Sequence, residues 1–83
     1  MRCLLTGVTG FVGRNLLLEA LRQGSYRSIV TPVRNLERFR AQCRGDGLDD
    51  IPSVVEPVEG EAPTWDFSKI GAVDHVVHCA GVL

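Results

Sequence analysis

The sequence has no apolar run approaching the ~18–20 residues that a membrane-spanning helix requires. Its first residues, Met1 to Leu5, contain too short an apolar stretch for a secretory signal and run directly into a glycine-containing segment. These two absences predict a cytoplasmic protein without membrane contact.

A dominant charge is absent too, since the formal net charge is −1. A chain with this balance offers no broad basic surface, so we expect no nucleic-acid partner. The basic residues that gather locally are Arg34, Arg38, Arg40 and Arg44. Cysteines number three and are widely spaced, which favours reduced thiols over a disulfide framework or a zinc site.

What is present fits one small domain covering residues 1–83. Hydrophobic residues make up 45% and charged residues 23% of the chain, which is typical of a folded rather than a disordered protein. A chain of this length buries only about 60–65% of its unfolded surface, so we expect a core of limited size.

The stretch from Cys3 to Gly13 carries the strongest pattern. An apolar run ends at Gly7, glycine recurs at Gly10 and Gly13, and an amphipathic segment begins before the last of them. This order predicts a strand, a tight turn and a helix. The N-terminus of a helix has unpaired backbone N–H groups and the positive end of the helix dipole, so it attracts phosphate where no side chain intervenes.

The three glycines follow a GxxGxxG spacing, whereas the usual dinucleotide-binding fingerprint is GxGxxG. Side chains at Gly7 or Gly10 would block a phosphate, and Gly13 would let the helix pack closely against the strand. A flexible glycine loop is the alternative, which the flanking strand and helix disfavour. A P-loop is also disfavoured, because Arg14 and Asn15 follow Gly13 in place of a Lys-Ser/Thr pair.

Strand and helix patterns alternate along the rest of the chain. We predict strands over residues 2–6, 28–33, 54–59 and 73–79, helices over 12–23 and 36–44, and a short helical segment over 64–70. This alternation indicates an α/β fold: a Rossmann-like parallel sheet, part of a doubly wound structure, with strand order 3-2-1-4.

Several residues mark where these elements end or bend. We expect Gly24 and Gly45 to end the two longer helices and Asn35 to cap the second. Pro32 removes a donor from the second strand, so we expect bent or broken pairing near its end, and Pro57 weakens the third strand. The first helix is expected to turn inward one apolar face made of Val12, Leu16, Leu17, Ala20 and Leu21.

The segment from Thr6 to Gly13 resembles the cofactor turn of extended or atypical short-chain dehydrogenases/reductases, in particular the NAD-dependent epimerase/dehydratase family. The resemblance spans essentially all 83 residues, but only the N-terminal part of such a protein. It implies that the turn binds a dinucleotide through Gly7, Thr9, Gly10, Phe11, Val12 and Gly13.

Arg34 follows the second predicted strand, where NAD-binding Rossmann folds often place an Asp or Glu against the ribose hydroxyls. A guanidinium suits a 2′-phosphate instead, because it offers charge and bidentate hydrogen bonding. We therefore expect NADP as the cofactor, with NAD as the alternative. Asn35 and Arg38 would assist; a solvated arginine at the start of a surface helix is the other interpretation of Arg34.

The resemblance implies further cofactor contacts later in the chain. Glu61 and Ala62 occupy the place of an acidic-aliphatic pair that lies beside the adenine in the family. Asp66-Phe67 is a rival position for that pair, and a solvent-exposed acidic loop is an alternative for both. Ala80 and Gly81 correspond to small residues that border the cofactor after the fourth strand.

His75 and His78 lie three residues apart on the fourth predicted strand, with Cys79 beside them. Residues at this spacing on a strand point to opposite faces of a sheet, so the two rings would not meet at one metal ion. We expect histidines of the core or its rim and no metal site.

Family members that transfer hydride use a Tyr-x-x-x-Lys pair beyond the fourth strand. Tyr26 is the only tyrosine of this chain, and Val30 stands four residues after it. The resemblance therefore supplies no catalytic residue. We expect the dinucleotide-binding portion of an epimerase, dehydratase or reductase, with a non-catalytic cofactor sensor or an interaction module as the alternative.

The predicted sheet leaves its fourth strand without a further neighbour, and only the 64–70 segment is available to cover one of its faces. Exposed edges and apolar faces promote association. We therefore expect self-association or a partner chain that covers the open edge.

Overall fold

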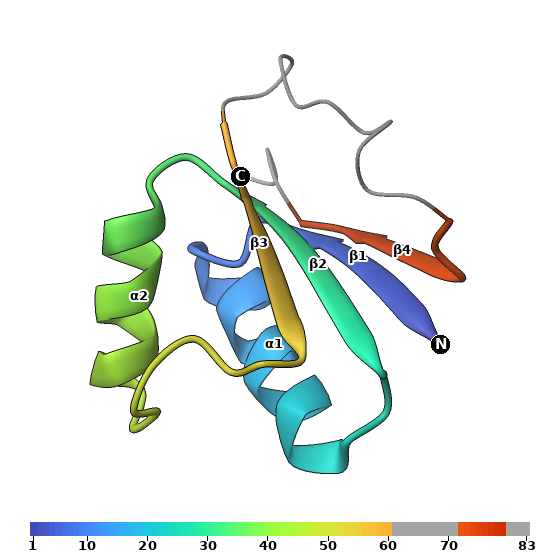
Figure 1. Cartoon of the computed structure of the whole chain (residues 1–83), viewed down its shortest axis with the longest axis horizontal. Helices are drawn as coiled ribbons and strands as arrows, with labels where there is room; N and C mark the ends of the chain where they lie inside the picture. Colours follow the sequence, from blue (N-terminus) through green and yellow to red (C-terminus); the bar gives the residue numbers. More distant parts are fainter. Residues whose placement is uncertain (61–71, 80–83) are drawn as a thin grey trace.

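A computed structural model describes residues 1–60 and 72–79 of the chain. Its elements are β1 (Arg2–Thr6), α1 (Phe11–Gln23), β2 (Ser28–Val33), α2 (Leu36–Gly45), β3 (Val55–Glu59) and β4 (His75–His78) (Figure 1). Within these described ranges, no helix is long and apolar enough to cross a membrane. The helical segment predicted over 64–70 lies outside the described residues.

The four strands form one parallel sheet in the order β3-β2-β1-β4. This arrangement confirms the predicted α/β fold and the strand order 3-2-1-4. Both helices lie on the same face of the sheet (Figure 1), as two successive right-handed connections that move in one direction require. Because the strands are parallel, the carboxyl ends of all four lie at the same edge of the sheet, and the glycine turn lies at that edge.

Pro32 interrupts the pairing of β2 on one side only. Successive residues of a strand bond to opposite neighbours, and the N–H of Ile29 donates to Val54 on the β3 side at 2.8 Å. Pro32 therefore faces β1, where its missing N–H ends the ladder at the pair Leu4↔Val30. The ladder to β3 continues as far as Val33↔Glu59, so the expected broken pairing is confirmed.

Pro57 is tolerated because β3 lies at the edge of the described sheet. Val54 accepts a hydrogen bond from β2, and the N–H of Gly60 donates to Val33 at 2.8 Å, so the even-numbered positions of this segment face β2. Pro57 consequently faces outward, where no ladder donor is needed. The proline that weakened the sequence prediction for β3 removes no hydrogen bond and blunts the strand edge.

The main hydrophobic core lies between the sheet and the two helices. Leu17 of α1 and Phe39 of α2 are its largest side chains, 2% and 0% exposed. They pack with residues from β1, the turn, β2, α2 and β3, namely Cys3, Leu5, Val8, Ile29, Val33, Cys43 and Val55. A smaller buried pair, Leu4 and Val30, lies in a separate cluster with Val58 and Val73 packed against it.

The buried face of α1 is narrower than the sequence pattern predicts. Gly13 and Leu17 are buried, whereas Val12 and Leu16 are 53% and 43% exposed. At Gly13 the helix lies so close to the turn that a Cβ would come within 2.0 Å of the Gly7 carbonyl oxygen, and the buried line of α1 runs through Gly13 and Leu17. Val12 and Leu16 flank that line, and their predicted burial was wrong.

Helix ends agree with the sequence at two of three positions. Gly24 ends α1 in the left-handed conformation with φ 65°, and the side chain of Asn35 caps α2 by accepting from the N–H of Arg38. Gly45, expected to end α2, is its last helical residue. Asp46 forms the cap there, and the positive φ of 91° falls on Gly47.

Candidate functional site: the glycine turn at the carboxyl edge of the sheet

The glycine turn, residues 7–10, joins the end of β1 at Thr6 to the start of α1 at Phe11. Gly7 has φ 75°, a left-handed conformation that favours glycine. The N–H of Gly10 donates to the Gly7 carbonyl at 3.1 Å, and the N–H of Arg14 then donates to the Gly10 carbonyl at 2.9 Å. Gly10 is thus the N-cap residue from which α1 begins.

Gly13 is a glycine because the fold requires it. A Cβ at this position would lie 2.0 Å from the carbonyl oxygen of Gly7 and 2.5 Å from its carbonyl carbon. Backbone atoms cannot rotate away as a side chain would, so α1 could not approach the turn with any other residue there. The close packing of helix against strand that the sequence pattern predicted is therefore present.

Among the residues that the structure describes, nothing comparable requires a glycine at position 10. Its φ of −85° and ψ of 167° are open to any residue. In the described structure, a Cβ there would meet only the Gly7 carbonyl oxygen, at an ordinary contact distance of 3.5 Å. Since the described fold would accept alanine at this position, the absence of a side chain leaves backbone open to something outside the chain.

The N-terminus of α1 keeps its backbone donors available. Within the part of the chain that the structure describes, no side chain caps this helix, and its first turn contains no acidic residue. Thr9, Phe11 and Val12 are exposed around it, with Phe11 84% exposed. Unpaired N–H groups and the positive helix dipole at such an end attract an anion.

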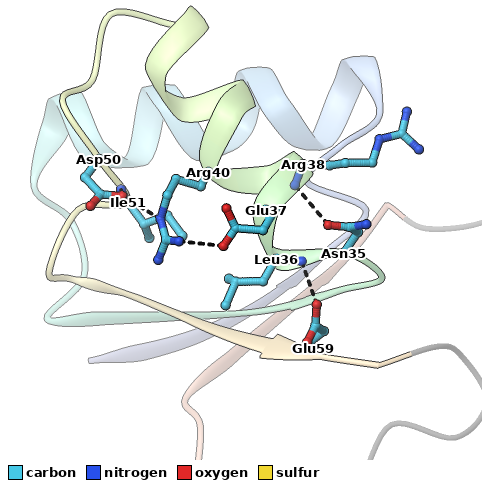
Figure 2. A network of polar contacts seen from close by, with 8 residues as sticks. All are labelled: Asn35, Leu36, Glu37, Arg38, Arg40, Asp50, Ile51 and Glu59. Atoms are coloured by element: carbon cyan, nitrogen blue, oxygen red, sulfur yellow. Dashed lines mark hydrogen bonds and ion pairs between the residues drawn. The ribbon is translucent and has the colours of Figure 1, made fainter.

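The N-terminus of α2 shows the opposite arrangement (Figure 2). The side chain of Asn35 accepts from the Arg38 N–H at 3.0 Å, and the carboxylate of Glu59 accepts from the Leu36 N–H at 2.9 Å. The chain's own groups therefore occupy this helix end. Of the two described helices, which both start at this edge of the sheet, α1 is the one whose N-terminal N–H groups are left for a bound phosphate.

The local basic cluster divides into paired and unpaired arginines. Arg40 bonds to Glu37 at 2.8 Å and to Asp50 at 2.9 Å (Figure 2), so its charge is already balanced. The Ile51 N–H, and after it Arg40, hold the pKa of Asp50 below its ordinary value. Arg34 and Arg38 are exposed and form no ion pair with another described residue.

The end of β4 lies directly beside the start of the glycine turn. The Cys79 N–H donates to the hydroxyl oxygen of Thr6 at 3.1 Å, and that hydroxyl is 2.7 Å from Nδ1 of His78. His75 instead meets the hydroxyl of Tyr26 at 3.0 Å. The two histidines thus lie on opposite faces of the sheet, and no group of three metal-ligating side chains occurs among the described residues.

The remaining predicted cofactor contacts lie outside the described residues. These are Glu61, Ala62, the rival pair Asp66-Phe67, Ala80 and Gly81. In the sequence, Glu61 and Ala62 come after β3, and Ala80 and Gly81 come after β4. The described strands β3 and β4 themselves end at the same edge of the sheet as the glycine turn.

Two contacts that hold the turn were not predicted from the sequence. The side-chain amide of Gln42 in α2 donates to the Val8 carbonyl at 3.0 Å. The guanidinium of Arg14 pairs with the carboxylate of Asp46, the residue that caps the C-terminal end of α2. Both contacts join residues more than thirty positions apart, and no local sequence signal marks such pairs.

A parallel α/β sheet whose first strand runs through a glycine turn into a helix N-terminus defines the Rossmann-like class of nucleotide-binding proteins. The model of the NAD dependent epimerase/dehydratase family matches residues 3–83. The chain belongs to that family, and membership implies a nicotinamide dinucleotide cofactor. Searches of curated proteins and of solved structures gave no match.

Proposed function

We propose that residues 1–83 form a single domain that binds NADP and serves as the cofactor-binding portion of an epimerase-, dehydratase- or reductase-type oxidoreductase. The observation that carries this proposal is Gly10. The described part of the fold would accept a side chain at this position, whereas a pyrophosphate bound at the turn would be blocked by one. Calorimetric titration of the chain with NADPH and with NADH tests this proposal. Saturable binding is expected, and no binding of either dinucleotide would refute it.

Different residues of the site would contact different parts of the cofactor. Gly7, Thr9 and Gly10, with the N–H groups of Phe11, Val12 and Gly13, would hold the pyrophosphate at the start of α1. Family resemblance assigns Glu61 and Ala62 to the adenine side and Ala80 and Gly81 to the border of the cofactor beyond β4. The bound nicotinamide would accept or donate a hydride, and the role of this chain would be to bind the cofactor and hold it in place.

The preference for NADP over NAD is supported by Arg34. Its guanidinium follows β2 directly, is exposed, and is not engaged by a carboxylate among the described residues. Arg38, in the first turn of α2, likewise has no carboxylate partner among the described residues. Figure 2 shows its side chain extending away from the Arg40 ion pairs. A 2′-phosphate placed at the end of β2 would satisfy both charges.

Replacing Arg34 with alanine is expected to weaken NADPH binding by about tenfold to a hundredfold, since a charge-assisted hydrogen bond contributes roughly 1.5–3 kcal/mol. NADH, which has no 2′-phosphate, is expected to bind as it does to the unaltered chain. Calorimetric titration with each cofactor measures both affinities. Arg40→Ala is the matched control, because Arg40 is already paired with Glu37 and Asp50; an equal loss of both cofactors in Arg34→Ala would contradict the assignment.

We also propose that the chain associates with a second copy through β4. Val76 is 62% exposed, and β4 contains neither a proline nor a formally charged residue, whereas Pro57 faces outward along β3. Edges without such protection pair with other strands. Val76→Lys is expected to shift the light-scattering mass of the purified chain toward the monomer, and a monomeric unaltered chain would refute the proposal.

A further inference from the structure

We propose that Gln42 is a positioning residue for the glycine turn, holding Val8 so that the N–H groups after Gly10 stand where the pyrophosphate needs them. This inference rests on the proposed dinucleotide binding and adds a specific residue to it. Gln42 lies on α2, outside the glycine motif, and contributes no group of its own to the cofactor.

The contact is well placed to fix the turn. Val8 lies between Gly7, which has φ 75°, and Thr9, which is exposed. Its side chain is 1% exposed and belongs to the main core, while its carbonyl accepts from Nε2 of Gln42 at 3.0 Å. Core packing alone would hold the side chain and leave the peptide plane free to rotate; the hydrogen bond removes that freedom.

A second tie from the same helix holds the other side of the turn. The backbone N–H of Arg14 bonds to the Gly10 carbonyl, and its guanidinium pairs with Asp46, whose side chain is only 6% exposed. The contacts from Gln42 and Asp46 thus hold Val8 and Arg14, which lie on either side of Gly10 in the sequence. Because α2 also begins next to Arg34, one rigid helix connects the turn with the residues proposed to hold the 2′-phosphate.

The test compares a ligand that contains the pyrophosphate with one that does not. Gln42→Met keeps the length of the side chain and removes the donor, and it is expected to weaken NADPH binding by about fivefold to tenfold, the effect of one neutral hydrogen bond. Adenosine 2′-monophosphate, which reaches only the Arg34 side, is expected to bind with unchanged affinity. If the unaltered chain binds NADH but not NADPH, the same comparison is made with NADH in place of NADPH and adenosine in place of adenosine 2′-monophosphate.

Two variants serve as controls for stability and for the donor. Gln23→Met removes an amide that bonds to Glu19 at the exposed end of α1, and it is expected to change neither affinity. Gln42→Lys supplies another N–H donor to Val8 and is expected to restore most of the NADPH affinity. Asp46→Asn weakens the ion pair with Arg14 and is likewise expected to weaken NADPH binding while leaving the affinity for adenosine 2′-monophosphate unchanged. This variant keeps the test decisive if Gln42→Met does not fold.

The possible failures are separable. Unchanged NADPH affinity in both Gln42→Met and Asp46→Asn, or an equal loss for both ligands, would overturn the positioning role and leave the proposed function intact. An unaltered chain that binds neither NADPH nor NADH would overturn the proposed function itself.

Discussion

Replacing Gly10 with alanine is expected to leave the chain folded and to lower its affinity for a nicotinamide dinucleotide by about a hundredfold or more, because the new methyl group would stand between the pyrophosphate and several charge-assisted N–H contacts. Of the atoms in residues 1–60 and 72–79, that methyl group would meet only the Gly7 carbonyl oxygen, at 3.5 Å. Calorimetry with NADPH and NADH measures the affinity, and denaturant unfolding measures the stability.

The stability measurement is the internal control for this substitution. Alanine is a poorer N-cap residue than glycine, so a loss of up to about 1 kcal/mol in the free energy of unfolding is expected. Retained stability together with lost binding would separate a role in ligand approach from a role in the fold. If Gly10→Ala binds the dinucleotide as tightly as the unaltered chain, the pyrophosphate does not lie at this turn.

Replacing Gly13 with alanine is expected to have the largest effect on stability, a loss of roughly 3 kcal/mol or more, at the upper end of what overpacking costs. Its Cβ would lie 2.0 Å from the Gly7 carbonyl oxygen, so either α1 or the turn must move. In a chain this short, such a loss is a large fraction of the whole free energy of unfolding. Circular dichroism during urea unfolding provides the measurement.

Gly45→Ala is the matched control for Gly13→Ala, since both glycines are helical. A Cβ at Gly45 would meet no described atom within 4 Å. Because alanine is the better helix former, stability is expected to stay the same or rise by about 0.5–1 kcal/mol. A Gly13→Ala variant that unfolds at the same urea concentration as Gly45→Ala would contradict the close approach of α1 to the turn.

Most of the architecture could be predicted because it depends on local patterns. The apolar run before Gly7, the glycine spacing and the caps at Gly24 and Asn35 each act within a few residues, and the handedness of the connections then fixes the strand order. Pro32 could be interpreted correctly for the same reason: a missing N–H has its effect in the strand that carries it.

The rest depends on contacts between distant parts of the chain. Helical periodicity groups Val12 and Leu16 with Leu17, but the approach of α1 at Gly13 decides which of them is buried. Pro57 was harmless because of the side of β3 on which it lies, which follows from the register with β2. No local sequence pattern predicts the hydrogen bond from Gln42 to Val8.

The central claim, that main-chain N–H groups at the start of α1 bind the pyrophosphate, is tested most directly by nuclear magnetic resonance of the amide groups during titration. Addition of NADPH, or of ADP as a smaller pyrophosphate, is expected to shift the amide signals of Gly10, Phe11, Val12 and Gly13, while adenosine leaves them in place. Saturable binding of NADPH with those four signals unmoved would contradict the account.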